Sequence, residues 1–336
     1  MNEKKPILGK RYQRRTDYHN YIVGERAKAR SSIIKTVSNC RRLSVPCLCG
    51  RDDESLLLAT IDRWGIPSNH LICMYCGLIR VSPRWDHDTY RRIYEGHFWS
   101  LQTGQSNITR ERFNLSIKRS VAFARTIFEY VPDIKGMRII EIGCSYGAGL
   151  QHLKGKGALL VGYDFDRDII SAGREFTGLN LRHGGIREAL NEMESRYDFV
   201  ILRHVFEHML DPFAEGKLLR DLVSDDGLIF IEVPGVLNFF KWSPDPIFIF
   251  NTFHVYSYCL RTLRQVMERC GFSLIRGDEH IYSLWKPSLT INISPWENRD
   301  EAMRILAFIR PMERKRLWGQ MLPIRIYRQM RNWIYD

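Results

Sequence analysis

The sequence predicts an α/β fold in which helices cover both faces of a mostly parallel sheet. Two observations carry this prediction: short apolar segments alternate with amphipathic ones after Met137, and each apolar segment has the length of a strand. Such alternation is typical of parallel strands joined by crossover helices. The expected strands are 137–143, 158–163, 179–183, 198–202 and 228–233, and the expected helices include 166–175, 186–195 and 211–223.

The segments on either side of this alternation predict how the domain begins and ends. Before it, apolar residues recur at spacings of three and four, which predicts an amphipathic helix over 111–131. After it, a helix at 260–270 is followed by two strands near 273–276 and 281–285. Because a short turn joins these two strands, we expect an antiparallel hairpin at one edge of the sheet.

The net charge of +12 is concentrated at the two ends of the 336-residue chain. Residues 1–45 hold 12 Lys/Arg against 3 Asp/Glu, residues 301–336 hold 8 against 3, and the body is close to neutral. Basic ends favour contact with nucleic acid, an anionic membrane or an acidic polymer, and solvated tails are the alternative. We divide the chain into a basic arm (1–45), a cysteine-rich lobe with an aromatic connector (46–110), the α/β domain (111–286) and a basic C-terminal extension (287–336).

Hydropathy and cysteine content predict the cellular compartment. No stretch reaches the 18 apolar residues that a membrane span needs, and the N-terminus lacks the apolar core of a secretory signal. We therefore expect a cytoplasmic protein. In that reducing compartment the eight cysteines are expected as metal ligands, catalytic groups or buried thiols rather than as disulfides.

A glycine-rich motif, EIGCSYGAG at 141–149, lies between the first expected strand and the helix after it. Glycines there let the backbone turn sharply and approach a ligand, and free N–H groups at the helix start can accept a carboxylate. A dinucleotide fingerprint fits poorly, because Ser145 and Ala148 occupy glycine positions. The acidic residue two before the first glycine, Glu141, suits a cofactor that carries an ammonium and a sulfonium.

Two further elements complete the expected cofactor pocket. Asp164 ends the second strand, where a carboxylate can accept both ribose hydroxyls; helix capping is the alternative. Phe165 beside it can pack on adenine, and backbone at Gly185 and Ile186 can cover that base. Arg203, at the carboxyl end of the fourth strand, is expected at the rim of the pocket.

Together with HVFEH at 204–208 and Asp211-Pro212, these motifs resemble class I S-adenosylmethionine-dependent methyltransferases over roughly residues 120–285. The resemblance implies a Rossmann-like methyltransferase sheet with S-adenosylmethionine as the cofactor. Glu207 and His208 are expected as hydrogen-bonding groups at a helix start rather than as catalysts. The cofactor contacts that the resemblance implies are Glu141, Gly143, Cys144, Ser145, Gly147, Asp164, Phe165, Gly185, Ile186 and Arg203.

Four cysteines form two tight pairs, Cys47/Cys49 and Cys73/Cys76, each followed by glycine. Four thiolates from two turns suit a tetrahedral structural zinc, whereas the C-x-C spacing of the first pair leaves buried thiols as the alternative. The second pair, with Leu78, Pro83 and tyrosines after it, resembles the N-terminal zinc lobe of sugar C-methyltransferases and related bacterial glycan methyltransferases. The large C-terminal domain of those enzymes has no counterpart in these residues, which leaves C-methylation and a deoxysugar-nucleotide substrate unsupported.

A long aromatic segment runs from Glu232 to Tyr258, beyond the carboxyl end of the fifth strand, where an acceptor lid is expected. In the resembling family a histidine recurs just before a Y-S-x-x-x-L stretch, and here His254 takes that place. We therefore regard His254 as the candidate catalytic base, with capping of helix 260–270 as the alternative. Phe253 stands where the sugar C-methyltransferases have a glutamate.

The function that we expect is methyl transfer from S-adenosylmethionine to an oxygen, with carbon and nitrogen as alternatives, of a small molecule or sugar. The resemblance places this activity in polysaccharide or glycolipid synthesis. An RNA methyltransferase that grips RNA with the zinc lobe and basic ends is a second hypothesis, against which the neutral body argues. An inactive scaffold is a third, against which the intact motif of Glu141, Gly143, Gly147 and Asp164 argues.

The C-terminal residues 314–335 place apolar side chains at helical spacing with arginines on other faces, and Pro323 interrupts them. This pattern is typical of a helix that lies on an anionic membrane, here at its inner face. Packing on the body of the protein or on a second subunit is the alternative.

Overall fold

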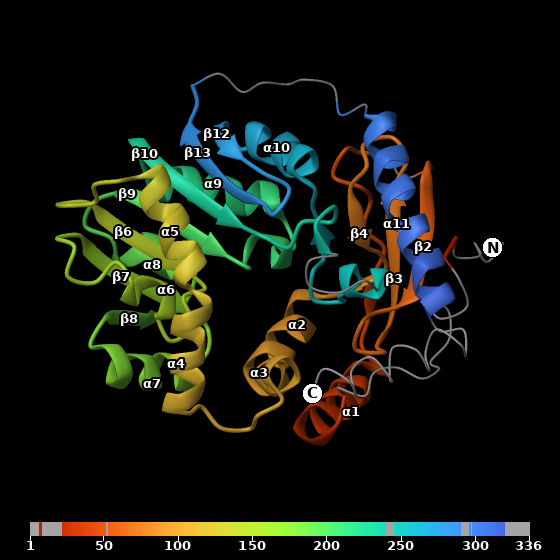
Figure 1. The fold of residues 1–336 in the computed structure, drawn as a ribbon, viewed down its shortest axis with the longest axis horizontal. Helices are drawn as coiled ribbons and strands as arrows, with labels where there is room; N and C mark the ends of the chain where they lie inside the picture. Colours follow the sequence, from red (N-terminus) through yellow and green to blue (C-terminus); the bar gives the residue numbers. More distant parts are fainter. Residues whose placement is uncertain are drawn as a thin grey trace, which may run out of the picture.

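The computed structural model describes residues 7–8, 22–51, 53–239, 245–289, 296 and 298–319. Within these residues two sheets lie side by side, a seven-stranded sheet and a smaller four-stranded sheet, with helices between them (Figure 1). None of the described helices is both long and apolar enough to cross a bilayer.

The seven-stranded sheet confirms the predicted mostly parallel architecture with an antiparallel hairpin at one edge. Its strand order is β12-β13-β10-β9-β6-β7-β8; β8 to β10 run parallel, whereas β13 pairs antiparallel with both β10 and β12. The strands are β6 (Arg138–Ile142), β7 (Leu159–Asp164), β8 (Asn180–His183), β9 (Tyr197–Arg203), β10 (Val223–Glu232), β12 (Phe272–Gly277) and β13 (Tyr282–Pro287).

Alternate residues of the central strands face opposite layers of helices, as the period of two in a strand requires. Ile139 packs with α5, α6 and α7, whereas its neighbour Ile140 belongs to the core shared with α8, α9 and α10. Both faces are therefore covered, which explains the continuously apolar strands. The covering helices are α5 (Val121–Tyr130), α6 (Ala148–Gln151), α7 (Arg167–Thr177), α8 (Ile186–Glu192), α9 (Pro212–Leu222) and α10 (Leu260–Arg269).

The single helix predicted over 111–131 is wrong in one respect, because it is two helices, α4 (Arg110–Arg119) and α5. The break falls at Ser120, whose ψ is near zero and whose hydroxyl donates to the carbonyl oxygen of Ser116 at 2.8 Å. A serine that satisfies backbone groups locally competes with continuation of a helix.

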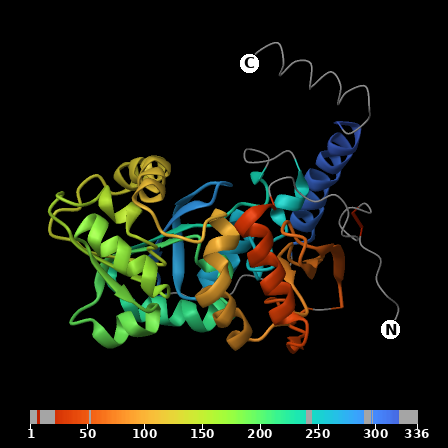
Figure 2. The same ribbon diagram turned by 90° about the horizontal axis from the view of Figure 1, so that it is seen from below.

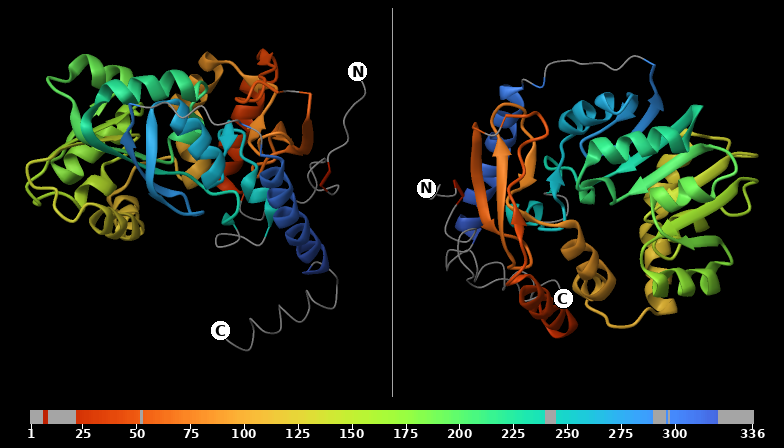
Figure 3. Two further views of the ribbon diagram at one scale, coloured as in Figure 1. Left: turned by 90° about the horizontal axis from the view of Figure 1, so that it is seen from above. Right: turned by 180° about the vertical axis from the view of Figure 1, so that it is seen from behind.

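The four-stranded sheet is antiparallel and has the order β11-β4-β3-β2. Three of its strands come from the cysteine-rich region, and the fourth comes from the aromatic segment after β10. The strands are β2 (Ser55–Ile61), β3 (Pro67–Cys73), β4 (Ile79–Val81) and β11 (Tyr256–Ser257). We call this sheet and the helix that covers it, α11 (Arg299–Gly319), the small lobe (Figure 3).

Helix α11 lies within the predicted C-terminal extension and packs on the four-stranded sheet. Ala302, Ile305, Leu306 and Ile309 are buried against the sheet together with Leu58, Ile72, Ile79, Ile247 and Phe250. The amphipathic pattern expected over 314–335 falls almost wholly outside the described residues, which end at Gly319.

The aromatic segment, where an acceptor lid is expected, is buried over much of its described part. Phe250, Phe253 and Tyr258 are fully buried, and Tyr256 and Ser257 pair with β4. The described part therefore packs between the two sheets, where its aromatic rings bury apolar surface, and its role beside the acceptor stays a prediction.

Residues before the α/β domain form a helical layer. Helix α1 (Gly24–Val37), within the predicted basic arm, buries Ala29, Ile33 and Val37 and lies alongside α3 (Trp99–Thr103), as Figure 2 shows. The remaining elements of this layer are β1 (Arg42–Leu43), β5 (Arg84–Trp85), α2 (His87–Ile93) and a π-helical turn, η2 (Tyr94–Phe98).

Candidate functional site

The glycine-rich loop follows β6 and leads into α6. Gly143 and Gly147 have φ near +70°, in the left-handed region that favours glycine. A Cβ added at Gly143 would also overlap Cγ2 of Val205, which follows β9. The loop is therefore held tightly against the turn after β9, and glycine is required at position 143.

Asp164, at the end of β7, holds this loop. Its Oδ2 accepts a hydrogen bond from the backbone N–H of Ser145 at 2.9 Å, and its Oδ1 accepts from Asp166 at 3.0 Å. Burial raises the pKa of Asp164 above its ordinary value. Capping of α7, the alternative role considered for Asp164, is performed by Asp166, which accepts from the N–H groups of Asp168 and Ile169.

The residues expected around adenine lie together next to Asp164. Phe165 is 62% exposed, and its ring lies so close to Gly185 that a Cβ there would be 2.6 Å from Cζ. Ile186 begins α8 and is buried, and Cys144 is buried below the loop. An exposed aromatic ring at the edge of a glycine loop leaves one face available to a flat base.

Arg203 and two glutamates form a buried charged group beside the loop. Arg203 Nε donates to Glu232 at 2.8 Å, its Nη1 lies 3.8 Å from Glu141, and its guanidinium stacks over the ring of Phe123. Burial raises the pKa of Glu141 to about 7, although Arg203 opposes the rise. The Oε2 atom of Glu141 is buried without a hydrogen-bond partner among the described residues, and an incoming ammonium would satisfy it.

A second polar cluster lies at the end of β9, in the turn that contacts Gly143. Glu207 is buried there, and its Oε1 lies 3.9 Å from Nε2 of His208 and 3.9 Å from Nε2 of His254. His204 lies 3.5 Å from the same oxygen and 3.4 Å from Glu232. We call Glu207, His208 and His254 the histidine cluster.

The electrostatics of the three histidines differ. Burial lowers the pKa of His208 and lowers that of His254 well below the ordinary value, so both imidazoles are neutral at pH 7. Desolvation also acts to lower the pKa of His204, whose side chain is 54% exposed, but its ion pairs with Glu207 and Glu232 outweigh it and raise the pKa to about 10. Burial opposes ionisation of Glu232, yet His204 and Arg203 lower its pKa to about 2.

The cluster includes residues that sequence reasoning assigned to other roles. Glu207 and His208 were expected to serve a helix start, and His254 stood alone as the candidate base. The alternative of His254 as a helix cap is not seen in the described contacts, because Cys259 occupies the N-cap of α10. The HVFEH spacing was the available signal, but no local pattern connects it to a histidine 46 residues later.

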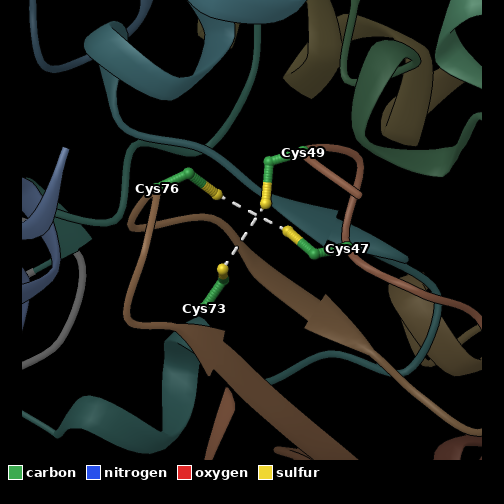
Figure 4. A group of neighbouring side chains, drawn as sticks. All are labelled: Cys47, Cys49, Cys73 and Cys76. Carbon is green, nitrogen blue, oxygen red and sulfur yellow. Dashed lines mark hydrogen bonds between the residues drawn. The ribbon is translucent and has the colours of Figure 1, made fainter. Parts of the chain in front are cut away.

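The four cysteines of the small lobe converge on one point (Figure 4). Sγ of Cys47 lies 3.5 Å from that of Cys76, Sγ of Cys49 lies 3.7 Å from that of Cys73, and all four lie within 4.8 Å of one another. Two tight turns bring the pairs together: the N–H group of Gly50 donates to the carbonyl oxygen of Cys47, and that of Gly77 donates to the carbonyl oxygen of Cys73, both at 2.8 Å. Four thiols at such separations suit one tetrahedral metal ion.

The seven-stranded sheet, the glycine loop and the acidic residues at the ends of β6 and β7 define a Rossmann-like domain of the methyltransferase class. Residues 111–276 match the family model described as a methyltransferase domain. The chain therefore carries an S-adenosylmethionine-dependent methyltransferase domain over these residues.

Curated relatives match only part of this chain. It is similar to a ubiquinone biosynthesis O-methyltransferase of Neisseria meningitidis, 30% identical over 105 residues, covering 29% of this chain and 44% of that protein. It is also similar to the enzyme of the same name from Dinoroseobacter shibae, 33% identical over 100 residues, 28% and 40% of the two chains. The chain thus spans less than half the length of these two relatives.

Among solved structures, the fold resembles magnesium protoporphyrin IX methyltransferase from Synechocystis PCC 6803 with bound S-adenosylhomocysteine. That likeness has a TM-score of 0.42 and 15% identity, and it covers 60% of this chain and 98% of the other.

Proposed function

We propose that the protein transfers the methyl group of S-adenosylmethionine to a hydroxyl oxygen of a small-molecule or sugar acceptor. One observation carries this proposal: Glu207 and His208 of the histidine cluster belong to the turn that packs against the glycine-rich loop. Val205, which contacts Gly143, lies between His204 and Glu207 in that turn. The cofactor loop and the proton-accepting groups are thereby adjacent.

The cofactor is proposed to occupy the carboxyl edge of the seven-stranded sheet. Glu141 would accept the ammonium, because its buried Oε2 lacks a partner among the described residues. Asp164 would accept the ribose hydroxyls, and Phe165 would cover adenine. S-adenosylmethionine supplies the electrophilic methyl group, so the protein must hold the acceptor in line and accommodate the proton of its hydroxyl.

Oxygen is the acceptor atom that the site supports best. Attack by a hydroxyl requires loss of its proton, and the histidine cluster offers two neutral imidazoles for that purpose, His254 being the original candidate. The two named relatives are O-methyltransferases. A setting in polysaccharide or glycolipid synthesis rests on the resemblance of the cysteine lobe alone.

We also propose that one structural zinc ion binds Cys47, Cys49, Cys73 and Cys76. Their sulfur separations fit the donor set, and thiolates in pairs from two turns are the ligands of structural zinc. The ion would join the turn before β2 to the turn between β3 and β4 and so stabilise the small lobe.

Calorimetry and methyl transfer together test the proposed function. Full-length protein is expected to bind S-adenosylmethionine or S-adenosylhomocysteine and to bind NAD far more weakly. With methyl-labelled cofactor, label should pass to hydroxylated acceptors, tested as separate panels of sugars and phenols, in a base-stable ether linkage. Preference for NAD would contradict the cofactor assignment, and label found only in amines or on carbon would contradict O-methylation.

A further inference from the structure

The carboxylate of Glu207 is buried beside the proposed acceptor position. It is 2% exposed, and neither oxygen has a hydrogen-bond partner among the described residues. The nearest described histidine nitrogens lie 3.5 to 3.9 Å away, without hydrogen-bonding geometry. His204, which is cationic at pH 7, supplies one counter-charge 3.5 Å from Oε1 on the exposed side. On the buried side, Nε2 of His208 and Nε2 of His254 face the same oxygen without a hydrogen bond to it, an arrangement that is costly unless a further positive charge lies between them.

The hydrogen bonding of His208 shows which of its nitrogens is free. Nδ1 lies 2.7 Å from the carbonyl oxygen of Phe253 and 2.7 Å from the phenol oxygen of Tyr94. Because the carbonyl can only accept, Nδ1 carries the proton, and the phenol oxygen of Tyr94 is a second acceptor of the same N–H group. In the neutral imidazole Nε2 then bears a lone pair, and this atom is the one 3.9 Å from Glu207. A lone pair that faces a carboxylate is repelled unless something positive lies between them.

Metal-binding histidines have this arrangement, in which the distal N–H donates to a backbone carbonyl and fixes the other nitrogen toward the ion. His254 presents Nε2 to the same oxygen of Glu207 at 3.9 Å. The ligand atoms of Glu207, His208 and His254 lie within 4.8 Å of one another. Bonds of about 2.0–2.2 Å to a common tetrahedral ion place the donors about 3.4 Å apart, so binding would draw the three ligand atoms together by about half an ångström.

We propose that Glu207, His208 and His254 bind a divalent transition-metal ion, separate from the ion of the cysteine cluster. Two imidazole nitrogens and one carboxylate oxygen suit Mn²⁺, Fe²⁺, Co²⁺ or Zn²⁺. Three protein ligands leave open positions, to which the oxygen of the acceptor can bind.

This part of the proposal rests on the proposed O-methylation. A bound divalent ion lowers the pKa of a coordinated hydroxyl. The O–H bond breaks and its proton passes to water; the oxygen then forms the O–C bond as the C–S bond of the sulfonium breaks. His254 is in this case a ligand and not the general base.

Binding of Mn²⁺ and Co²⁺ tests the site, using full-length protein that keeps zinc at the cysteines after dialysis against a weak chelator has emptied the histidine cluster. Mn²⁺ has little affinity for thiolates, so the loss of the free Mn²⁺ signal in electron paramagnetic resonance reports the histidine cluster and not the cysteines. Calorimetry with Co²⁺ provides the second measurement. We expect one ion per chain, and Glu207→Gln and His254→Asn should each weaken binding more than tenfold. The control is His87→Asn, an exposed histidine at the start of α2.

If Glu207 only stabilises the fold and binds no metal, different results are expected. If both ions fail to bind the native protein, or if Glu207→Gln binds them as tightly as the native protein, the site is refuted. Urea unfolding of metal-free Glu207→Gln and native protein shows whether the variant is folded, so that a loss of metal binding in a folded variant reports the missing ligand. S-adenosylmethionine binding in metal-free buffer is measured separately, so failure of the proposed function is distinguishable from failure of this site.

Discussion

The phenol oxygen of Tyr94 lies 2.7 Å from Nδ1 of His208, although 114 residues separate them in the chain. Tyr94 belongs to the π-helical turn η2, and the rings of Phe98 and Phe253 pack around the same imidazole and phenol. The connector before the methyltransferase domain therefore forms one wall of the histidine cluster. Residues on both sides of the domain boundary position His208.

Replacing Tyr94 by phenylalanine tests this contact. Tyr94→Phe keeps the ring but removes the hydroxyl, so we expect a loss of about 1–1.5 kcal/mol in the free energy of unfolding. The turnover number should fall more than the affinity for the cofactor, because His208 loses one of its two orienting contacts. Urea unfolding and steady-state kinetics measure the two effects. Tyr130→Phe, in a half-buried tyrosine of α5, is the matched control, and equal effects in both variants would argue against a role for the contact.

Asp164→Ala should weaken binding of S-adenosylmethionine by ~1.5–3 kcal/mol, because a charge-assisted hydrogen bond to the ribose is lost. The substitution also frees the N–H of Ser145, which Asp164 now binds. The control is Asp166→Ala, two residues away, which removes the cap of α7 and should cost about 1 kcal/mol in stability with little change in affinity. Calorimetry and thermal unfolding separate the two outcomes. Equal affinity in native protein and Asp164→Ala would disprove the ribose assignment.

Gly143→Ala should abolish cofactor binding and destabilise the fold for two reasons. Alanine is strained at the positive φ of this position, and its Cβ would overlap the side chain of Val205. Gly136→Ala has a similar φ but open space around the added atom, so it should cost only about 1–2 kcal/mol. The double variant Gly143→Ala/Val205→Ala should recover part of the lost stability. No recovery would show that φ strain alone explains the effect.

Removal of two thiols tests the proposed zinc ion. Native protein should contain about one zinc per chain held by the cysteines, and Cys73→Ser/Cys76→Ser should contain none at that cluster. Elemental analysis after dialysis against a weak chelator, which strips the histidine cluster first, gives the measurement. Cys40→Ser, outside the cluster, should retain full zinc. Equal zinc in the native protein and the double variant would rule the cysteine site out.

The raised pKa of the buried Asp62 carboxyl group should make the stability of the protein depend on pH. It is fully buried, accepts hydrogen bonds from Trp64, Ile66 and Thr252, and burial raises its pKa from 3.8 to about 6. A carboxyl group whose pKa is higher in the folded state binds its proton more tightly there. Its contribution to stability therefore declines as pH rises from about 4 to about 6, by up to ~3 kcal/mol.

Asp62→Asn should remove this decline and keep the oxygen acceptor in place. The measurement is urea unfolding of both proteins between pH 4 and pH 7, with the difference plotted against pH. A difference that does not change over this interval would contradict the assignment.

The sheet was predictable because its signal is local. Ile139 and Ile140 face different helical layers, and both must be apolar whatever follows in the chain. Glu141 and Asp164 were also predictable, since parallel strands end at one edge of a sheet. The pairing of Tyr256 with Arg80 was not, because a two-residue strand carries no periodicity and its partner lies in a different region of the sequence.

The histidine cluster shows the same limit in the site. Glu207 and His208 are neighbours in sequence, but Tyr94 and His254 reach them only through the packing of η2 and the aromatic segment. Sequence spacing cannot reveal these tertiary contacts, because Tyr94, His208 and His254 belong to separate elements. The four cysteines were found because their turns carry the pattern themselves.

Because the small lobe draws on both ends of the chain, its completion is delayed during translation. The sheet strands β2 to β4 leave the ribosome long before Ile305 and Ile309, which cover them. Ile309 lies 230 positions after Ile79, and at about 5–20 residues per second the synthesis of this stretch takes roughly 10–50 s. During the later part of that interval only residues such as Ile247 and Phe250 are available to cover the apolar face around Leu58 and Ile72, and the part that α11 covers stays exposed. The seven-stranded sheet, whose last strand ends at Pro287, can already form by then. The nascent chain therefore exposes part of the apolar face of the four-stranded sheet, to which chaperones can bind, until α11 has been synthesised.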